Sequence, residues 1–298
     1  MRKLVNVPVA SVWTTDCSAR EGDGEALTAT PDIESWIKGM DYARLIDLHD
    51  RNLIQTQVLY GEEVIVVEEK NGWSSVLVPS QASRKNSDGY PGWIQSVQLI
   101  DQPETWTQHQ EFVLVTSHGA KLKHGEEIRK LAYATILPLA SKDEESIYVH
   151  TPTGIGQLAA NDAELFVEEN GDGGMIVECG MQFLRLPYLW AGNSSFGYDC
   201  SGFVYSICRA NGYLIPRDVG EQSEFGRDVK LSELEVGDAL FFAYEEGKGE
   251  LHHVGLYAGD GKLLHSPKTG KCIELIELKG TFYEKELCKA RRYVRDAR

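Results

Sequence analysis

Hydrophobic and polar positions alternate in short runs through residues 1–170, and Gly, Pro, Asn and Asp separate the runs. Clear examples are residues 63–67, 75–78 and 93–97. Short strands with turns at close spacing are typical of small all-β barrels. The stretch from Pro31 to Leu48 departs from this pattern, because its apolar spacing fits 3.6 better than 2. The pattern therefore predicts a β-rich region with one helical insert.

A weak internal repeat runs through this β-rich region. Tyr60-Gly61 precedes the apolar run 64–66, and Tyr133-Ala134 precedes the apolar run 136–139. A second β-like run follows in each case, which predicts two related modules of about 60–90 residues. Residues 80–89 form a polar loop inserted in the first module.

From about residue 175 the pattern changes to helices followed by strands. Helical spacing is seen at residues 175–184, 199–210 and 218–225. The β-like runs that follow are residues 239–243, 252–258, 262–266, 272–278 and 290–294. This order is typical of an α+β domain with an antiparallel sheet. We predict two small all-β barrels, at 1–105 (with the helical insert) and 106–170, followed by an α+β domain at 171–298.

Composition and charge narrow the classes of function. The chain has 298 residues, 42% of them hydrophobic, and a net charge of −15. The negative charge argues against nucleic acid as a partner. No apolar run approaches the roughly 20 residues of a membrane span. The basic first residues lead into no apolar segment, so we expect a cytoplasmic protein unless an export signal was removed.

The six cysteines are too sparse for a disulfide scaffold and form no C-x-x-C pair. We expect reduced thiols. No H-E-x-x-H motif or paired cysteine motif is present, so no metal site is predicted.

Cys200 is the first candidate for chemistry. Asp199 is a good N-cap, which places Cys200 in the first turn of a helix. A helix N-terminus lowers the pKa of a thiol, and its free N–H groups can hold an oxyanion. Gly202 is expected to leave room for a ligand. The alternative is that Cys200 is a buried structural cysteine, like Cys208 eight residues on.

Two histidines are candidates for the base that such a thiol needs. In the alternating run 251–259, His253 lies on the face opposite the apolar one, beside Gly255. His265, on the next run, can orient the His253 ring. The two share a face only if an odd number of residues connects the strands, so we predict a three- or five-residue loop. The alternative is that one or both histidines are structural.

Residues 175–298 resemble the NlpC/P60 cysteine peptidases of bacteria. The resemblance rests on five ordered motifs: PYLWAG at 187–192, YDCSGFV at 198–204, LEVGDALFF at 234–242, HVGLYAG at 253–259 and LHS at 264–266. It implies a papain-like α+β catalytic domain with Cys200 as nucleophile, His253 as general base and His265 as the orienting residue. The N-terminal part resembles tandem bacterial SH3 modules.

The order of these domains resembles the YkfC-type γ-D-glutamyl-L-diamino acid endopeptidases. In these enzymes a tyrosine of the first SH3 module and an acidic residue hold the free amine of an N-terminal L-alanine. The resemblance suggests Tyr90 and Asp218 for these roles. It also suggests Tyr188, Asp199 and Ser201 as substrate contacts. Two positions depart from the pattern: Val219 replaces a frequent serine and Ala191 a frequent glycine. For Asp218 the alternative is helix capping, and for Tyr90 it is loop packing.

The resemblance implies hydrolysis of the γ-D-Glu–diamino acid bond in released muropeptides, without a cofactor. The expected partner is a small peptide, and a monomer is favoured. The sequence leaves the diamino acid open between lysine and meso-diaminopimelate. One alternative is a secreted hydrolase of intact peptidoglycan whose SH3 modules anchor it to the wall. Another is a wall-binding protein with an inactive papain-like domain.

Overall fold

The computed structural model describes residues 1–169 and 171–294, in two compact units. One unit comprises Met1–Phe166 with Ser194–Phe196, and the other comprises Val167–Asn193 with Gly197–Arg298. Asn170, the last residue we assign to the second module, lies outside the described residues. No helix within them has the length and apolar character needed to cross a membrane.

The first unit contains two seven-stranded antiparallel sheets with the same strand order. The strands of the first sheet are β1 (Arg2–Val5), β2 (Val9–Trp13), β3 (Ile54–Leu59), β4 (Glu63–Lys70), β5 (Trp73–Val78), β6 (Tyr90–Gln95) and β7 (Leu99–Asp101). Those of the second are β8 (Phe112–Val115), β9 (Ala120–His124), β10 (Glu127–Leu131), β11 (Ile136–Lys142), β12 (Ser146–Thr151), β13 (Gly154–Ala159) and β14 (Ala163–Leu165). The orders, β3-β2-β6-β5-β4-β1-β7 and β10-β9-β13-β12-β11-β8-β14, correspond strand by strand. The predicted repeat is confirmed.

The repeated tyrosines mark equivalent corners of the two modules. Tyr60 and Tyr133 are both buried. The residues after them, Gly61 and Ala134, both take positive φ values, of 78° and 64°. Each corner leads into the strand that the repeat predicts, β4 or β11.

The first module carries two additions that the second lacks. Between β2 and β3 lie the helices α1 (Ile33–Lys38) and α2 (Tyr42–Asp50), which confirm the helical insert. Asp32 and Asp41 cap them by accepting hydrogen bonds from backbone N–H groups. Residues 79–89 form a loop between β5 and β6, whereas only two residues connect the equivalent strands β12 and β13 of the second module. Short 3₁₀ turns complete the unit: η1 (Gly24–Ala26), η2 (Ser96–Gln98), η3 (Trp106–Gln108) and η4 (Ala160–Asp162).

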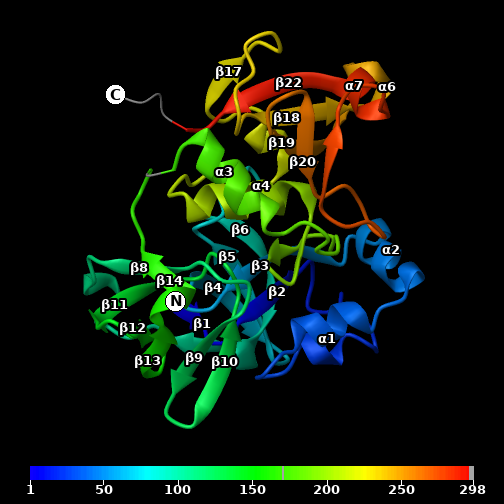
Figure 1. The fold of residues 1–298 in the computed structure, drawn as a ribbon. Coiled ribbons are helices and arrows are strands. Elements are labelled where there is room, and N and C mark those ends of the chain that lie inside the picture. Colours follow the sequence, from blue (N-terminus) through cyan, green and yellow to red (C-terminus); the bar gives the residue numbers. More distant parts are fainter. Residues whose placement is uncertain (170, 295–298) are drawn as a thin grey trace. The chain divides into compact units, whose positions relative to one another are not determined.

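The second unit is an α+β domain built on a six-stranded antiparallel sheet, as expected. The sheet order is β17-β22-β18-β19-β20-β21, from β17 (Arg227–Val229), β22 (Leu287–Arg292), β18 (Ala239–Ala243), β19 (Leu251–Tyr257), β20 (Lys262–His265) and β21 (Glu274–Glu277). The helices are α3 (Gly173–Met181), α4 (Cys200–Ala210), α5 (Val219–Gln222), α6 (Tyr244–Gly247) and α7 (Phe282–Glu286). A short pair, β15 (Asn193–Ser194) and β16 (Gly197–Tyr198), precedes α4. Helix α4 packs on β19, and α3 packs on α4 and β20 (Figure 1).

Candidate active site

Cys200 occupies the first turn of α4, as the N-cap predicts. Asp199 takes the N-cap position in an extended conformation, and its Oδ1 accepts a hydrogen bond of 2.6 Å from the Gly202 N–H. The apolar stripe of α4 faces the interior, and its members are all buried: Cys200, Phe203, Val204, Ile207 and Cys208. The cysteine thus stands at the start of a helix whose other stripe residues anchor it in the core.

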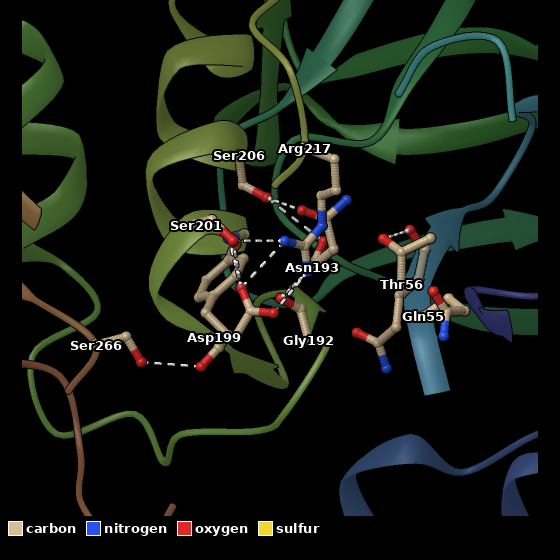
Figure 2. Close-up of polar contacts among 12 residues, drawn as sticks. Gln55, Thr56, Gly192, Asn193, Asp199, Ser201, Ser206, Arg217 and Ser266 are labelled. Carbon is tan, nitrogen blue, oxygen red and sulfur yellow. Dashed lines mark hydrogen bonds and ion pairs between the residues drawn. The ribbon is translucent and has the colours of Figure 1, made fainter. Parts of the chain in front are cut away.

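A buried ion pair supports this helix start (Figure 2). The Arg217 guanidinium is only 1% exposed and donates to Asp199 Oδ1 and Oδ2 at 3.1 and 2.9 Å. It also donates to Ser201 Oγ at 2.9 Å and to the Gly192 carbonyl at 3.3 Å. The cation therefore ties together the residues on both sides of Cys200. Arg217 is not among the predicted site residues, because no local spacing signals a partner 18 residues away.

Gly202 serves packing and not ligand access, so the expectation of open space there is wrong. A Cβ at this position would lie 2.1 Å from the Gly192 carbonyl oxygen and 3.0 Å from an Arg217 guanidinium nitrogen. The space beside Gly202 is filled by the network that holds the helix start.

His253 and His265 share a face of the sheet. Leu256 pairs with Leu264 and Tyr257 with Leu263, so five residues, 258–262, lie between the last paired positions. The predicted odd-numbered connection is confirmed. His265 consequently lies opposite Gly255, where a Cβ would come within 2.8 Å of the His265 Cβ. Gly255 is what allows the two histidine strands to approach at this point.

The two rings are directly coupled. His253 Nε2 lies 2.8 Å from His265 Nδ1, and both side chains are buried. This bond occupies one nitrogen of His253 and leaves Nδ1 as its second ring nitrogen. Tyr283 of α7 packs on both rings, with centroid distances of 5.2 and 4.9 Å. Tyr283 is not among the predicted site residues, because it follows a turn without a clear periodic pattern.

Burial sets the protonation state of the resting site. It raises the pKa of the Cys200 thiol to about 12, and the Asp199 carboxylate acts in the same direction. Backbone N–H groups of Val254 and Ser201 oppose the rise. A helix N-terminus stabilises a nearby negative charge by about 0.3–1 kcal/mol. A shift from 9.0 to about 12 corresponds to roughly 4 kcal/mol. The expected lowering of this pKa is therefore wrong for the resting site.

The pKa values of the two histidines are lowered, which also favours the neutral form. Burial lowers the pKa of His253 well below its usual value, and the neighbouring His265 adds to this. Burial also lowers the pKa of His265, to about 4. Neutral thiol and neutral imidazole are thus the favoured resting forms.

The other predicted site residues fall into two groups. Asp199 and Ser201 are buried, and their side-chain oxygens engage Arg217. Tyr188 is buried, and burial followed by the Cys200 and Asp199 charges raises its pKa, which places it near the nucleophile candidate. Asp218 is half-buried at the N-cap of α5 and makes no side-chain capping bond. Their contacts with substrate stay predictions.

Tyr90 belongs to the first unit, where it opens β6 at the end of the inserted loop. Its side chain is 2% exposed. The ammonium of Lys85, from the same loop, contacts the Tyr90 hydroxyl and lies 4.1 Å from the ring centroid. Lys85 also donates to Gln55 at 2.9 Å. Loop packing is therefore present, and the proposed role in substrate binding stays a prediction.

All six cysteines are free thiols. Within the described residues, no group of three or more His, Cys, Asp or Glu side chains is arranged to hold a metal ion.

Comparison with known proteins identifies the three parts of the chain. Residues 185–292 match the NlpC/P60 family, 115–166 the YKFC SH3b2 domain, and 50–99 the bacterial dipeptidyl-peptidase SH3 domain. The chain is 48% identical to the γ-D-glutamyl-L-lysine dipeptidyl-peptidase of Bacillus subtilis (strain 168), over 98% of this chain and 99% of that protein. It belongs to the NlpC/P60 family of cysteine peptidases. The expected fold, two SH3-like modules before a papain-like α+β domain, is confirmed.

Further relatives cover the whole length of this NlpC/P60 peptidase. A Bacillus cereus protein also named γ-D-glutamyl-L-lysine dipeptidyl-peptidase is 39% identical, over 98% of this chain and 91% of that protein. The crystal structure of an NlpC/P60 family protein from Bacillus cereus superposes with a TM-score of 0.95 at 37% identity, covering 99% of this chain and all of that one. The likeness includes both SH3 modules as well as the catalytic domain.

Proposed function

We propose that this peptidase hydrolyses the bond between γ-D-glutamate and the diamino acid in released muropeptides that carry a free N-terminal L-alanine. The observation that carries the proposal is the full-length likeness to two proteins named for a γ-D-glutamyl-L-lysine bond. The products would be L-Ala-γ-D-Glu and the diamino acid or the peptide that begins with it.

In the proposed mechanism Cys200 is the nucleophile and His253 the general base. His253 Nδ1 takes the thiol proton as Sγ attacks the γ-carbonyl carbon, and backbone N–H groups at the start of α4 hold the oxyanion. The imidazolium then gives its proton to the departing amine, leaving a thioester. Water, deprotonated by His253, attacks the thioester and regenerates the thiol. His265 holds the His253 ring through the 2.8 Å bond.

We further infer that Asp218 and Tyr90 recognise the free amine. A cationic amine needs an anionic partner, and Asp218 supplies a carboxylate at the half-buried N-cap position of α5. A site that pairs with a charged amine rejects an uncharged amide, because the amide cannot form the same charge-assisted bond. The amine is free only after release from the sugar chain, so we also propose that the enzyme acts in the cytoplasm on recycled fragments. The chain's net charge of −15 agrees with this and disfavours attachment to an anionic wall.

Mass spectrometry of paired substrates tests the proposal. L-Ala-γ-D-Glu-L-Lys and its meso-diaminopimelate counterpart are each offered free and N-acetylated. We expect cleavage of the free peptides, at least 100-fold slower cleavage of the acetylated ones, and a preference between the two diamino acids that the assay reads directly. Cys200→Ala should abolish turnover. Cys208→Ala, on the same buried stripe, is the matched control and should retain it.

Two results would overturn parts of the proposal. Equal cleavage of free and acetylated peptides, with digestion of intact sacculi, would favour the secreted wall hydrolase and remove the amine-recognition role of Asp218. Turnover by Cys200→Ala would remove the assignment of the nucleophile. Asp218→Asn and Tyr90→Phe should raise KM for the free peptide and leave the alkylation rate of Cys200 unchanged.

A further inference from the structure

The second ring nitrogen of His265 is buried and has no hydrogen-bond partner within residues 1–169 and 171–294. The side chain is fully buried, and its Nδ1 is already used by His253. An unsatisfied buried polar atom costs about 1–3 kcal/mol, so such an atom in a catalytic domain calls for an explanation. One carboxylate oxygen, Glu274 Oε1, lies 3.5 Å from this nitrogen.

The sheet register holds these two residues together. Strands β20 and β21 are antiparallel, and His265 pairs directly with Glu274. Residues directly opposite one another on neighbouring strands project to the same face, with Cβ atoms about 4.5–5.5 Å apart. The Glu274 side chain is 45% exposed, so a small rotation brings its carboxylate from 3.5 Å to hydrogen-bond distance.

The bond between the histidines determines where the protons must be. A neutral imidazole has one donor and one acceptor nitrogen. If His253 Nδ1 is to accept the thiol proton, its own proton must sit on Nε2 and be donated to His265 Nδ1. The proton of His265 is then on Nε2, the nitrogen that faces Glu274. A carboxylate only accepts hydrogen bonds, so it favours this arrangement of protons and opposes the reverse one.

We propose that Glu274 is a positioning residue of the catalytic site, which accepts the His265 Nε2–H and thereby fixes the tautomer and orientation of both histidines. Cys200, His253, His265 and Glu274 then form one chain of proton donors and acceptors across α4, β19, β20 and β21. His265 is faced by His253 from β19, by Glu274 from β21 and by Tyr283 from α7. Of these three, Glu274 supplies the carboxylate.

The inference rests on the proposed pairing of Cys200 with His253 and not on the identity of the substrate. The test therefore includes two measurements on the free enzyme. The first is the side-chain ¹⁵N spectrum of the histidines, which distinguishes the two neutral tautomers of His265. The second is the rate at which iodoacetamide alkylates Cys200, read by mass spectrometry of the peptide that contains it. Steady-state kcat and KM on the cleaved peptide complete the set.

Three variants make the comparison. Glu274→Ala removes the acceptor, and Glu274→Gln keeps an acceptor oxygen without the charge. Glu277→Ala is the matched control, because Glu277 lies on the same strand opposite Lys262 and away from the histidines. We expect Glu274→Ala to mix the His265 tautomers and to lower both kcat and the alkylation rate by about 3- to 10-fold, with KM within about twofold. Glu277→Ala should behave like the wild type. Glu274→Gln should fall between Glu274→Ala and the wild type, because its amide can accept from Nε2–H but can also donate to the other tautomer.

Several outcomes would overturn the inference. One is Glu274→Ala with the wild-type tautomer and wild-type kcat. Another is equal loss in Glu274→Ala and Glu277→Ala, which would assign the effect to the negative charge of this strand and not to the bond with His265. A rise in KM at constant kcat would make Glu274 a substrate contact. If the peptide itself is the wrong substrate, no variant turns it over, but the tautomer and the alkylation rate still decide the role of Glu274.

Discussion

Removing the buried ion pair between Asp199 and Arg217 should strongly lower the free energy of unfolding of the catalytic domain. The Arg217 side chain is 1% exposed and the Asp199 side chain 10%, and two bonds of 2.9 and 3.1 Å join them. Arg217→Met removes the cation and leaves the carboxylate with the Gly202 N–H as its cap partner. Removing one member of a buried pair costs about 3–5 kcal/mol, because the other charge stays desolvated and unpaired. We expect that loss in the free energy of unfolding.

Asp199→Asn should be destabilising too, since it removes the negative charge that faces the buried Arg217 guanidinium. The double variant removes both charges, so it should cost less than the sum of the single variants by about 1–3 kcal/mol. Lys230→Met is the control. Lys230 is 76% exposed and pairs with Glu233 on the surface, so its loss should change stability by less than about 0.5 kcal/mol.

The assay has to report on the catalytic domain alone, because the chain contains two compact units. Cys208 offers such a probe, since it is fully buried in the middle of α4. Pulsed alkylation of Cys208 across a urea series gives the fraction of the domain that is unfolded. Strict additivity in the double variant, or Arg217→Met within 1 kcal/mol of the wild type, would refute the reasoning.

Three further predictions use the same readout. Ala191 has φ +59°, so Ala191→Gly should stabilise the domain by about 1 kcal/mol, and a loss of stability would contradict the strain argument. Gly255→Ala places a methyl group 2.6 Å from Leu263 Cδ1 and 2.8 Å from the His265 Cβ. It should lower the free energy of unfolding by about 1–3 kcal/mol and should also lower kcat. Wild-type activity would show that the strands adjust to the extra methyl group. Burial lowers the pKa of His265 from 6.5 to about 4. As the pH falls, the unfolded chain therefore protonates this histidine before the folded chain does. The free energy of unfolding is therefore unaffected by His265 above pH 6.5 and falls by about 3 kcal/mol as the pH drops to 4. His265→Asn should flatten that part of the pH dependence, and an unchanged slope would exclude His265 as its source.

The histidine pair was predictable because strand geometry is simple. Side chains alternate strictly along a strand, so the requirement that His253 and His265 share a face becomes a statement about loop parity. The observed register, with Leu256 opposite Leu264, satisfies it. The N-cap at Asp199 was equally local, because the capping bond spans three residues. Short-range rules of this kind can be applied to a sequence without knowing the tertiary structure.

The electrostatics of the site was not predictable in the same way. The field of the helix start at Cys200 is a local property, but the burial that outweighs it depends on everything packed around the thiol. Arg217 and Tyr283 come to the site from other segments of the chain, where spacing carries no signal of a shared partner. Gly202 shows the same limit. A glycine in a sequence suggests open space, but here the Gly192 carbonyl and the Arg217 guanidinium fill that space.

The duplication in the first unit separates what the fold requires from what has been added to it. Both modules have the same strand order, and β9–β10 and β12–β13 are each joined by two residues. The barrel therefore needs neither residues 14–53 nor residues 79–89, and additions to a rigid scaffold are where function is usually carried. The second addition leads directly into Tyr90, and its Lys85 contacts the Tyr90 hydroxyl. The inserted loop has no counterpart in the second module, and its contact with Tyr90 is loop packing, so the role of Tyr90 in substrate binding stays a prediction for the Tyr90→Phe variant to test.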